Sequence, residues 1–155
     1  MTLDPETDLT FTRHINAPGA LLWQCWTTPE HIKKFFIPKP HKIEECELDL
    51  RVGGRFNTTM NVDGKLFENE GVYLEIESGR RLVFTDTYSE GWKPAPDPFM
   101  TAIIEFEDDG YGKTAYTATA RHRSSGARQR HEDMGFYEGW GTVATQLEDY
   151  ANSLK

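Results

Sequence analysis

A long stretch of alternating polar and apolar residues limits what this chain can fold into more than any other feature. Between about residues 42 and 123 the alternation runs through six segments, with no helical pattern between them. Alternation at every second residue is typical of half-buried strands. Turn pairs such as Asp63-Gly64 and Ser78-Gly79 separate the segments, which predicts an antiparallel meander. The six segments are residues 42–51, 54–62, 66–76, 81–88, 99–107 and 113–122.

Helical patterns flank this region on both sides. Residues 9–15 predict one more strand, and two short helices follow, at 19–27 and from Thr28 to Pro38, where Pro29 suits the first helical position. From Ser125 to Leu154 one long helix is predicted, because its apolar residues share one face. Only a curved sheet is large enough to cover that face. The expected fold is therefore α+β, an antiparallel sheet of about seven strands curved around a long C-terminal helix.

Chain length and net charge limit the number of domains and the classes of binding partner. The 155 residues suit one domain, expected over residues 9–155 after a flexible tail at 1–8. The 17 Lys and Arg residues face 25 Asp and Glu residues, so the net charge is −8. Nucleic acids and anionic membranes need a basic face, so neither is expected as a partner.

The sequence also predicts where in the cell the protein is found. No apolar run approaches the roughly 20 residues of a membrane span. The first ten residues are polar and acidic, unlike a secretory signal. The two cysteines, Cys25 and Cys46, make no disulfide framework, and a cytoplasmic location is expected.

Several short motifs, in this order and spacing, carry a family resemblance. The chain resembles the START-like (SRPBCC) superfamily, and within it the subfamily of activator of heat-shock-protein ATPase homologues (AHSA-like), which implies the helix-grip fold known from Bet v-like proteins. Phe35-Phe36 departs from the tryptophans of many relatives, and Asp86 stands where relatives often have an aromatic residue. The motifs are Asn16-Ala17-Pro18, Trp23 with Trp26, residues 28–32, residues 49–56, Gly71, residues 74–76, residues 81–85, residues 134–136 and residues 139–141.

The resemblance implies an internal cavity that holds a small apolar or aromatic molecule. Ala118 and Ala120 are small residues on one strand face, opposite the part of the helix that carries Trp140, and Met100 shares an inward strand face with Ile104. Close packing of an ordinary core is the alternative reading. The candidate wall residues are Trp26, Phe35, Phe36, Phe56, Met60, Phe84, Ile104, Phe106, Tyr116, Ala118, Ala120, Phe136 and Trp140.

Three residues are candidates for acid–base chemistry. His122 ends the inward row, and Asp133 falls on the apolar face of the predicted helix. Asp133 is therefore either solvated or paired inside with His122, Arg121 or Arg123, and a pair with His122 at the cavity mouth is the arrangement suited to catalysis. Asp86 is a third candidate, whereas His131 is expected to face solvent. No metal and no cofactor are expected, because the histidines and cysteines lack ligand spacing.

Three functions remain open at this point. The first is a binding protein for a small apolar or aromatic molecule, acting as a monomer or homodimer. The second is an enzyme of the cyclase or hydrolase kind in the same cavity, and the sequence leans away from it. The third is a co-chaperone that activates a heat-shock-protein ATPase. That role is the least expected, because the eukaryotic activators add an N-terminal domain and only about eight residues precede the first strand here.

Overall fold

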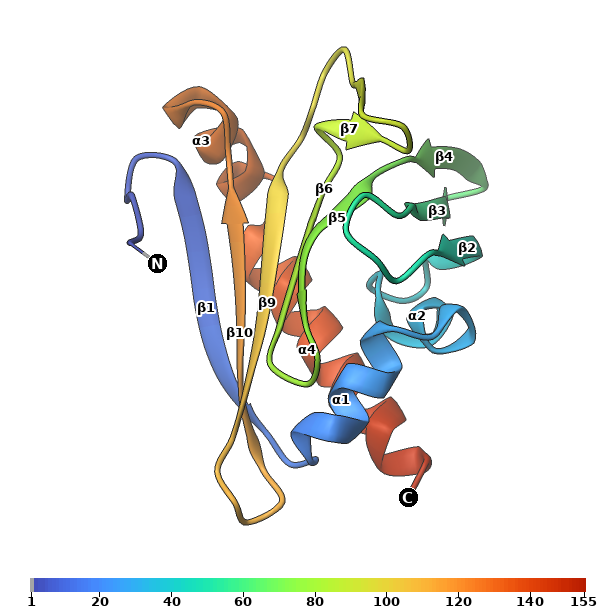
Figure 1. Ribbon diagram of the computed structural model, residues 1–155, viewed down its shortest axis with the longest axis vertical. Helices are drawn as coiled ribbons and strands as arrows, with labels where there is room; N and C mark the ends of the chain where they lie inside the picture. Colours follow the sequence, from blue (N-terminus) through green and yellow to red (C-terminus); the bar gives the residue numbers. More distant parts are fainter. Residues whose placement is uncertain (1) are drawn as a thin grey trace.

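Five antiparallel strands form the larger of two main sheets in the computed structural model, which describes residues 2–155 (Figure 1). The strand order is β1-β10-β9-β6-β5. Each neighbouring pair is antiparallel, as the alternating sequence predicted. The strands are β1 (Asp8–Ile15), β5 (Val72–Glu77), β6 (Arg81–Thr85), β9 (Thr101–Asp108) and β10 (Thr114–Arg121).

A second sheet of three strands continues the first at an angle. Its order is β2-β3-β4, and isolated bridges from Val52 to Tyr73 and from Arg55 to Val72 connect it to β5. A short hairpin beyond β6 makes a third, two-stranded sheet. The strands of these sheets are β2 (Lys42–Leu48), β3 (Phe56–Val62), β4 (Lys65–Asn69), β7 (Tyr88–Ser89) and β8 (Lys93–Pro94).

One predicted strand, residues 66–76, is broken where the two sheets separate. The break falls at Gly71, whose carbonyl accepts a hydrogen bond from the Phe56 amide at 2.9 Å. A Cβ at Gly71 would lie only 2.4 Å from the Thr85 carbonyl oxygen. The close approach of three backbone segments therefore requires glycine here, and it splits the meander into β4 and β5.

The two short helices after β1 form as predicted. They are α1 (Gly19–Trp26) and α2 (Pro29–Phe35), with Pro29 at the start of α2. Before β1, the Asp4 carbonyl accepts hydrogen bonds from the Thr7 and Asp8 amides. Met1, which belongs to the expected tail, lies outside the described residues.

The predicted single C-terminal helix is wrong in one respect, because it is two helices. α3 (Ser125–Asp133) and α4 (Phe136–Ser153) meet at Gly135, whose φ of 97° is left-handed. Such a backbone favours glycine and ends a helix. The sequence pattern treated both helices as one straight cylinder, so residues of α3 were assigned to the wrong face.

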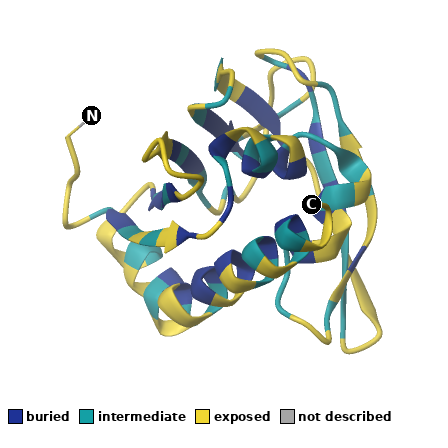
Figure 2. Ribbon diagram, turned by 90° about the horizontal axis from the view of Figure 1, so that it is seen from below, coloured by how far each residue is buried: buried dark blue, intermediate teal, exposed yellow. Residues whose placement is uncertain are grey.

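The face of α4 that packs on the sheets agrees with the sequence pattern. Phe136, Trp140, Val143, Leu147 and Ala151 are buried in the single core cluster. In Figure 2 the buried residues of α4 lie along the side turned toward the rest of the molecule. The helix-grip arrangement, a curved antiparallel sheet around a C-terminal helix, is thus confirmed.

Candidate functional site

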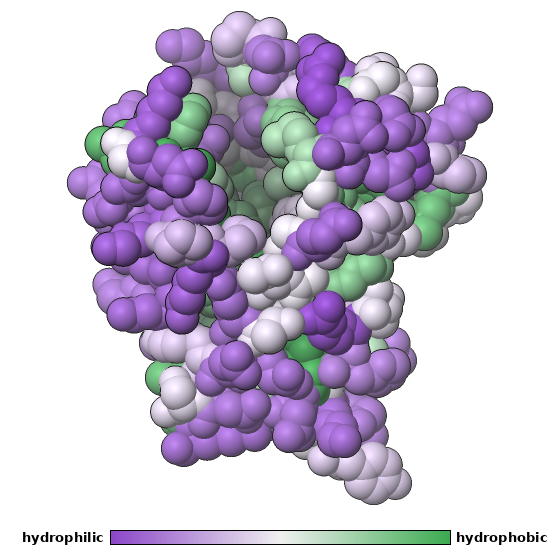
Figure 3. Space-filling model, turned by 180° about the vertical axis from the view of Figure 1, so that it is seen from behind, coloured by the Kyte–Doolittle hydropathy of each residue, from purple (hydrophilic) through white to green (hydrophobic). Residues whose placement is uncertain are grey.

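An apolar hollow lies where the two main sheets diverge. Its volume is about 240 Å³, and both sheets, the residue after α2 and the segment before β9 supply its walls. Figure 3 shows a face of the molecule that is hollowed in its upper half, with apolar residues in its depth. The lining residues are Phe36, Phe56, Thr58, Met60, Asn69, Glu70, Gly71, Phe84, Thr85, Asp86, Phe99 and Met100.

Three phenylalanines build one wall of the hollow. The rings of Phe56 and Phe84 stack at 4.1 Å with an angle of 8° between their planes. Phe36 meets both rings edge-on, at 5.8 Å and 6.2 Å. The ring of Phe36 also packs edge-on against the rings of Trp26 and Trp140, with ring centres 5.2 Å and 6.4 Å apart. The wall is therefore anchored in the core and offers a rigid aromatic surface.

Asp86 holds in place the segment that carries Phe99 and Met100, two further residues lining the hollow. Both of its carboxylate oxygens accept the Phe99 amide, at 2.9 Å and 2.8 Å, and one also accepts the Met100 amide at 3.0 Å. These bonds fix the end of the loop after β8 so that the side chains of Phe99 and Met100 line the hollow. The carboxylate that the sequence placed near the cavity is there, and its oxygens are occupied by backbone N–H groups.

Removing this carboxylate should loosen the loop. We expect Asp86→Ala to lower the free energy of unfolding by about 1.5–3 kcal/mol, the range for hydrogen bonds to charged groups. Amide exchange at Phe99 and Met100 should become faster. Denaturant unfolding and hydrogen exchange measure both effects. Asp97→Ala is the control, because Asp97 is exposed and only pairs with Arg123. Equal losses in the two variants would contradict this role of Asp86.

Two buried histidines, His122 and His131, contact the ring of Phe99. His122 Nδ1 donates to the Thr7 carbonyl at 2.8 Å, which leaves Nε2 as the acceptor in the neutral ring. His131 Nδ1 lies 2.8 Å from that nitrogen and donates to it. The Phe99 ring lies 4.6 Å from the His131 ring. Burial, and then the neighbouring His122, lower the pKa of His131 from 6.5 to about 4.

The hypothesis that His122 pairs with Asp133 is wrong, and the alternative of a solvated Asp133 agrees with the structure. Asp133 is exposed at the end of α3, and its carboxylate accepts a hydrogen bond from Gln129 Nε2 at 2.9 Å. His131, predicted to face solvent, is buried and only 7% exposed. Both errors share one cause, the break at Gly135, which turns α3 so that His131 and not Asp133 points at the sheet.

Only some of the predicted wall residues line the hollow. Phe36, Phe56, Met60 and Phe84 do, and they come from three different segments. Ala118 and Ala120 lie buried in the core with Phe136 and Trp140, so the hollow does not lie where the two alanines suggested. The remaining predicted residues are likewise core: Trp26, Phe35, Ile104, Phe106 and Tyr116.

Sequence reasoning did not assign Thr58, Phe99 and Met100 to the site. For Met100 the available signal was its inward strand face, and for Phe99 it was the position just after a loop rich in proline and glycine. Among residues 2–155, no three His, Cys, Asp or Glu side chains are grouped to hold a metal ion. In the same residues no helix is long and apolar enough to cross a membrane.

Comparison with solved structures places this architecture among known proteins. A Nitrosomonas europaea protein solved by crystallography is 43% identical, with a TM-score of 0.94 over 98% of both chains. A Mycobacterium smegmatis protein is 27% identical, with a TM-score of 0.78 over 94% of this chain and 90% of that one. An AHSA1-like protein from Aeromonas hydrophila, 19% identical, has the same fold, with a TM-score of 0.71 over 95% of this chain and 93% of that one.

The family model of the sequence agrees with these structures. Comparison with curated proteins found no match. The model described as activator of Hsp90 ATPase homolog 1-like protein matches residues 16–152, which is most of the chain. The chain therefore belongs to the family of activator of Hsp90 ATPase homolog 1-like proteins, with the START-like (SRPBCC) fold.

Proposed function

We propose that this protein binds a small apolar or aromatic molecule in the hollow between its two main sheets. One observation carries the proposal: six apolar side chains line one hollow of about 240 Å³, and four of them belong to or pack against the hydrophobic core. Burying apolar surface against such walls is favourable. The six side chains are those of Phe36, Phe56, Met60, Phe84, Phe99 and Met100.

The volume sets the size of the ligand. Pockets for drug-sized molecules run to roughly 300–1,000 Å³, and an apolar cavity of about 150 Å³ is enough for benzene. The hollow lies between these values, at about 240 Å³. We therefore expect a compact ligand of one or two rings, stacked beside Phe56 and Phe84.

The surrounding polar groups favour binding over catalysis. Three backbone N–H bonds leave the Asp86 carboxylate little acceptor capacity, and both ring nitrogens of His122 have partners. A general base needs a free lone pair within reach of its substrate. The arrangement supports a binding protein more than a cyclase or hydrolase, and the ATPase-activating role in the family's description rests on family membership alone.

Filling the hollow should abolish binding. We expect calorimetric titration to show 2-naphthol binding to the wild-type protein, and Met60→Trp to weaken that binding by at least about tenfold, because the larger ring occupies the space. Met134→Trp is the matched control, since Met134 is exposed and outside the hollow. Absence of 2-naphthol binding to the wild type, or equal affinity in both variants, would overturn the proposal.

A further inference from the structure

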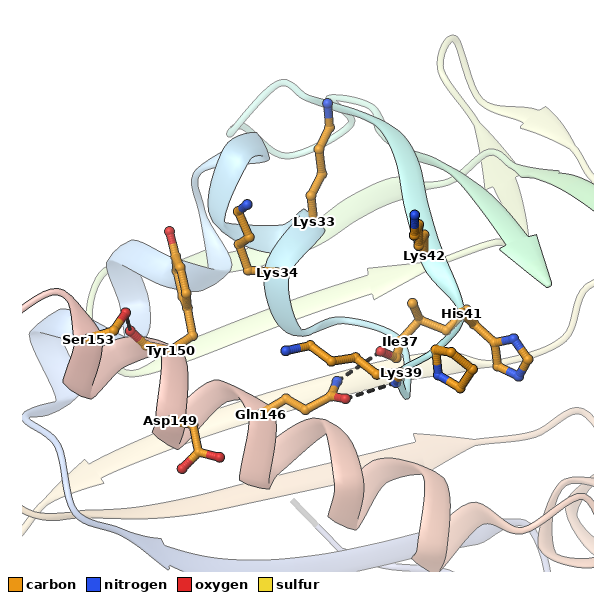
Figure 4. A pocket seen from close by; sticks show the side chains of 11 residues that line it. Lys33, Lys34, Ile37, Lys39, His41, Lys42, Gln146, Asp149, Tyr150 and Ser153 are labelled. Atoms are coloured by element: carbon orange, nitrogen blue, oxygen red, sulfur yellow. Dashed lines mark hydrogen bonds between the residues drawn. The ribbon is translucent and has the colours of Figure 1, made fainter. Parts of the chain in front are cut away.

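A second concavity, distinct from the hollow, carries a cluster of lysines. It has a volume of about 770 Å³ and lies between α2, the loop that follows α2, the start of β2 and the second half of α4 (Figure 4). Four lysines line this basic groove: Lys33, Lys34, Lys39 and Lys42. They fall within ten residues of a chain whose net charge is −8.

These lysines have no carboxylate partner within residues 2–155. All ion pairs in that part of the chain are made by arginines, and none by a lysine. Asp149 is the one acid lining the groove, and Figure 4 shows its carboxylate pointing away from Lys34 and Lys39. The groove therefore gathers four lysines against one lining carboxylate on an acidic protein, which attracts anions.

Hydrogen bonds to α4 hold the groove in shape. Gln146 Nε2 donates to the carbonyls of Phe35 and Ile37, at 3.0 Å and 2.8 Å, and its Oε1 accepts the Lys39 amide at 2.9 Å. Tyr150 bonds to His31 of α2 at 2.6 Å. The backbone that carries the lysines is thus fixed before any ligand arrives, which reduces the entropy cost of binding.

The lining is apolar as well as basic. Ile37, Pro40 and the ring of Tyr150 line the groove together with the lysines. Figure 4 shows Lys39 extending along the space between α2 and α4, above Gln146. A purely inorganic anion would leave these apolar surfaces uncovered, whereas an organic body would bury them.

We propose that the basic groove binds a small organic molecule that carries a diphosphate or triphosphate group. Lysine binds phosphate as a point charge. Figure 4 shows Lys33 pointing away from α4, so we assign the phosphate groups to Lys34, near Tyr150, and to Lys39, above Gln146. A volume of about 770 Å³ lies within the range of small-molecule pockets. Ile37, Pro40 and Tyr150 contact the organic part of the ligand.

Calorimetric titration with adenosine triphosphate and with inorganic tripolyphosphate tests this assignment. We expect both to bind, and adenosine triphosphate more tightly because of its organic part. Replacing two groove lysines, Lys34→Gln with Lys39→Gln, should weaken binding by at least about tenfold, since two charge-assisted contacts are lost. The control pair, Lys65→Gln with Lys113→Gln, changes the net charge equally at exposed lysines outside the groove and should change affinity by less than about twofold.

Other outcomes would overturn the proposal. They are equal losses in the two double variants, absence of binding, or tighter binding of a polyglutamate peptide or of phosphatidylserine vesicles than of adenosine triphosphate. All four substituted lysines are exposed, so the variants should fold, and unchanged unfolding temperatures verify this. Binding of 2-naphthol should be the same in every lysine variant, which separates failure at this site from failure at the hollow.

Discussion

Leu147→Ala should lower the free energy of unfolding by about 2–5 kcal/mol, the range for large-to-small changes in a core. Leu147 is fully buried in the middle of α4, within the cluster that joins the helix to both main sheets. The loss combines the transfer of the side chain with the cavity left behind. Denaturant unfolding monitored by circular dichroism measures it.

Leu154 provides the matched control for this prediction. It lies just after the end of α4 and is 40% exposed, although the sequence pattern placed it on the same apolar face. Leu154→Ala should therefore cost no more than about 0.5 kcal/mol, as ordinary surface changes do. A loss of that small size for Leu147→Ala would mean that α4 does not pack as described.

Acidification should destabilise the protein through His131. The folded-state pKa is about 4, below the ordinary value of 6.5, because the buried ring resists protonation. Between these values the unfolded chain binds more protons, so the free energy of unfolding falls as the pH falls from about 6.5 to about 4. The stabilising contribution of neutral His131 is fully present above pH 6.5. Its complete loss lowers the free energy of unfolding by an amount of the order of 3 kcal/mol.

The neighbouring His122 adds to the resistance of His131 to protonation. A charge on His131 would lie on a ring whose Nδ1 is 2.8 Å from His122 Nε2 and which contacts the apolar ring of Phe99. His131→Gln should therefore flatten the dependence of stability on pH between 4 and 6.5. His14→Gln, at an exposed histidine of β1, should leave it unchanged. Identical pH profiles for the wild type and His131→Gln would contradict this assignment.

Patterns of local period were enough to predict most of the fold. The strands and the buried face of α4 follow from alternation at two residues and from recurrence at 3.6 residues, because burial on one side imposes those periods. The same reasoning failed at Gly135. Periodicity continues smoothly through a glycine in sequence, whereas the left-handed backbone there starts a new helix axis, and every face assignment upstream of it changes.

The hollow was harder to predict, for a different physical reason. Ala118 and Ala120 suggested space under Trp140, but small residues also allow close approach of neighbouring elements, and both alanines lie in the core cluster away from the hollow. The space arises instead from the separation of the sheets at Gly71. That separation depends on contacts between Phe56, Gly71 and Thr85, which are distant in sequence and leave no periodic signal.

Methyl NMR of the protein with 2-naphthol tests the proposed site most directly. Methionine methyl groups labelled with ¹³C report on both walls, since Met60 and Met100 line the hollow, while Met134 is exposed and lies outside it. Our account predicts nuclear Overhauser contacts from the naphthol protons to the methyl groups of Met60 and Met100 and none to Met134. Contacts to Met134 alone, or a titration that leaves the methyl signals of Met60 and Met100 unchanged, would contradict it.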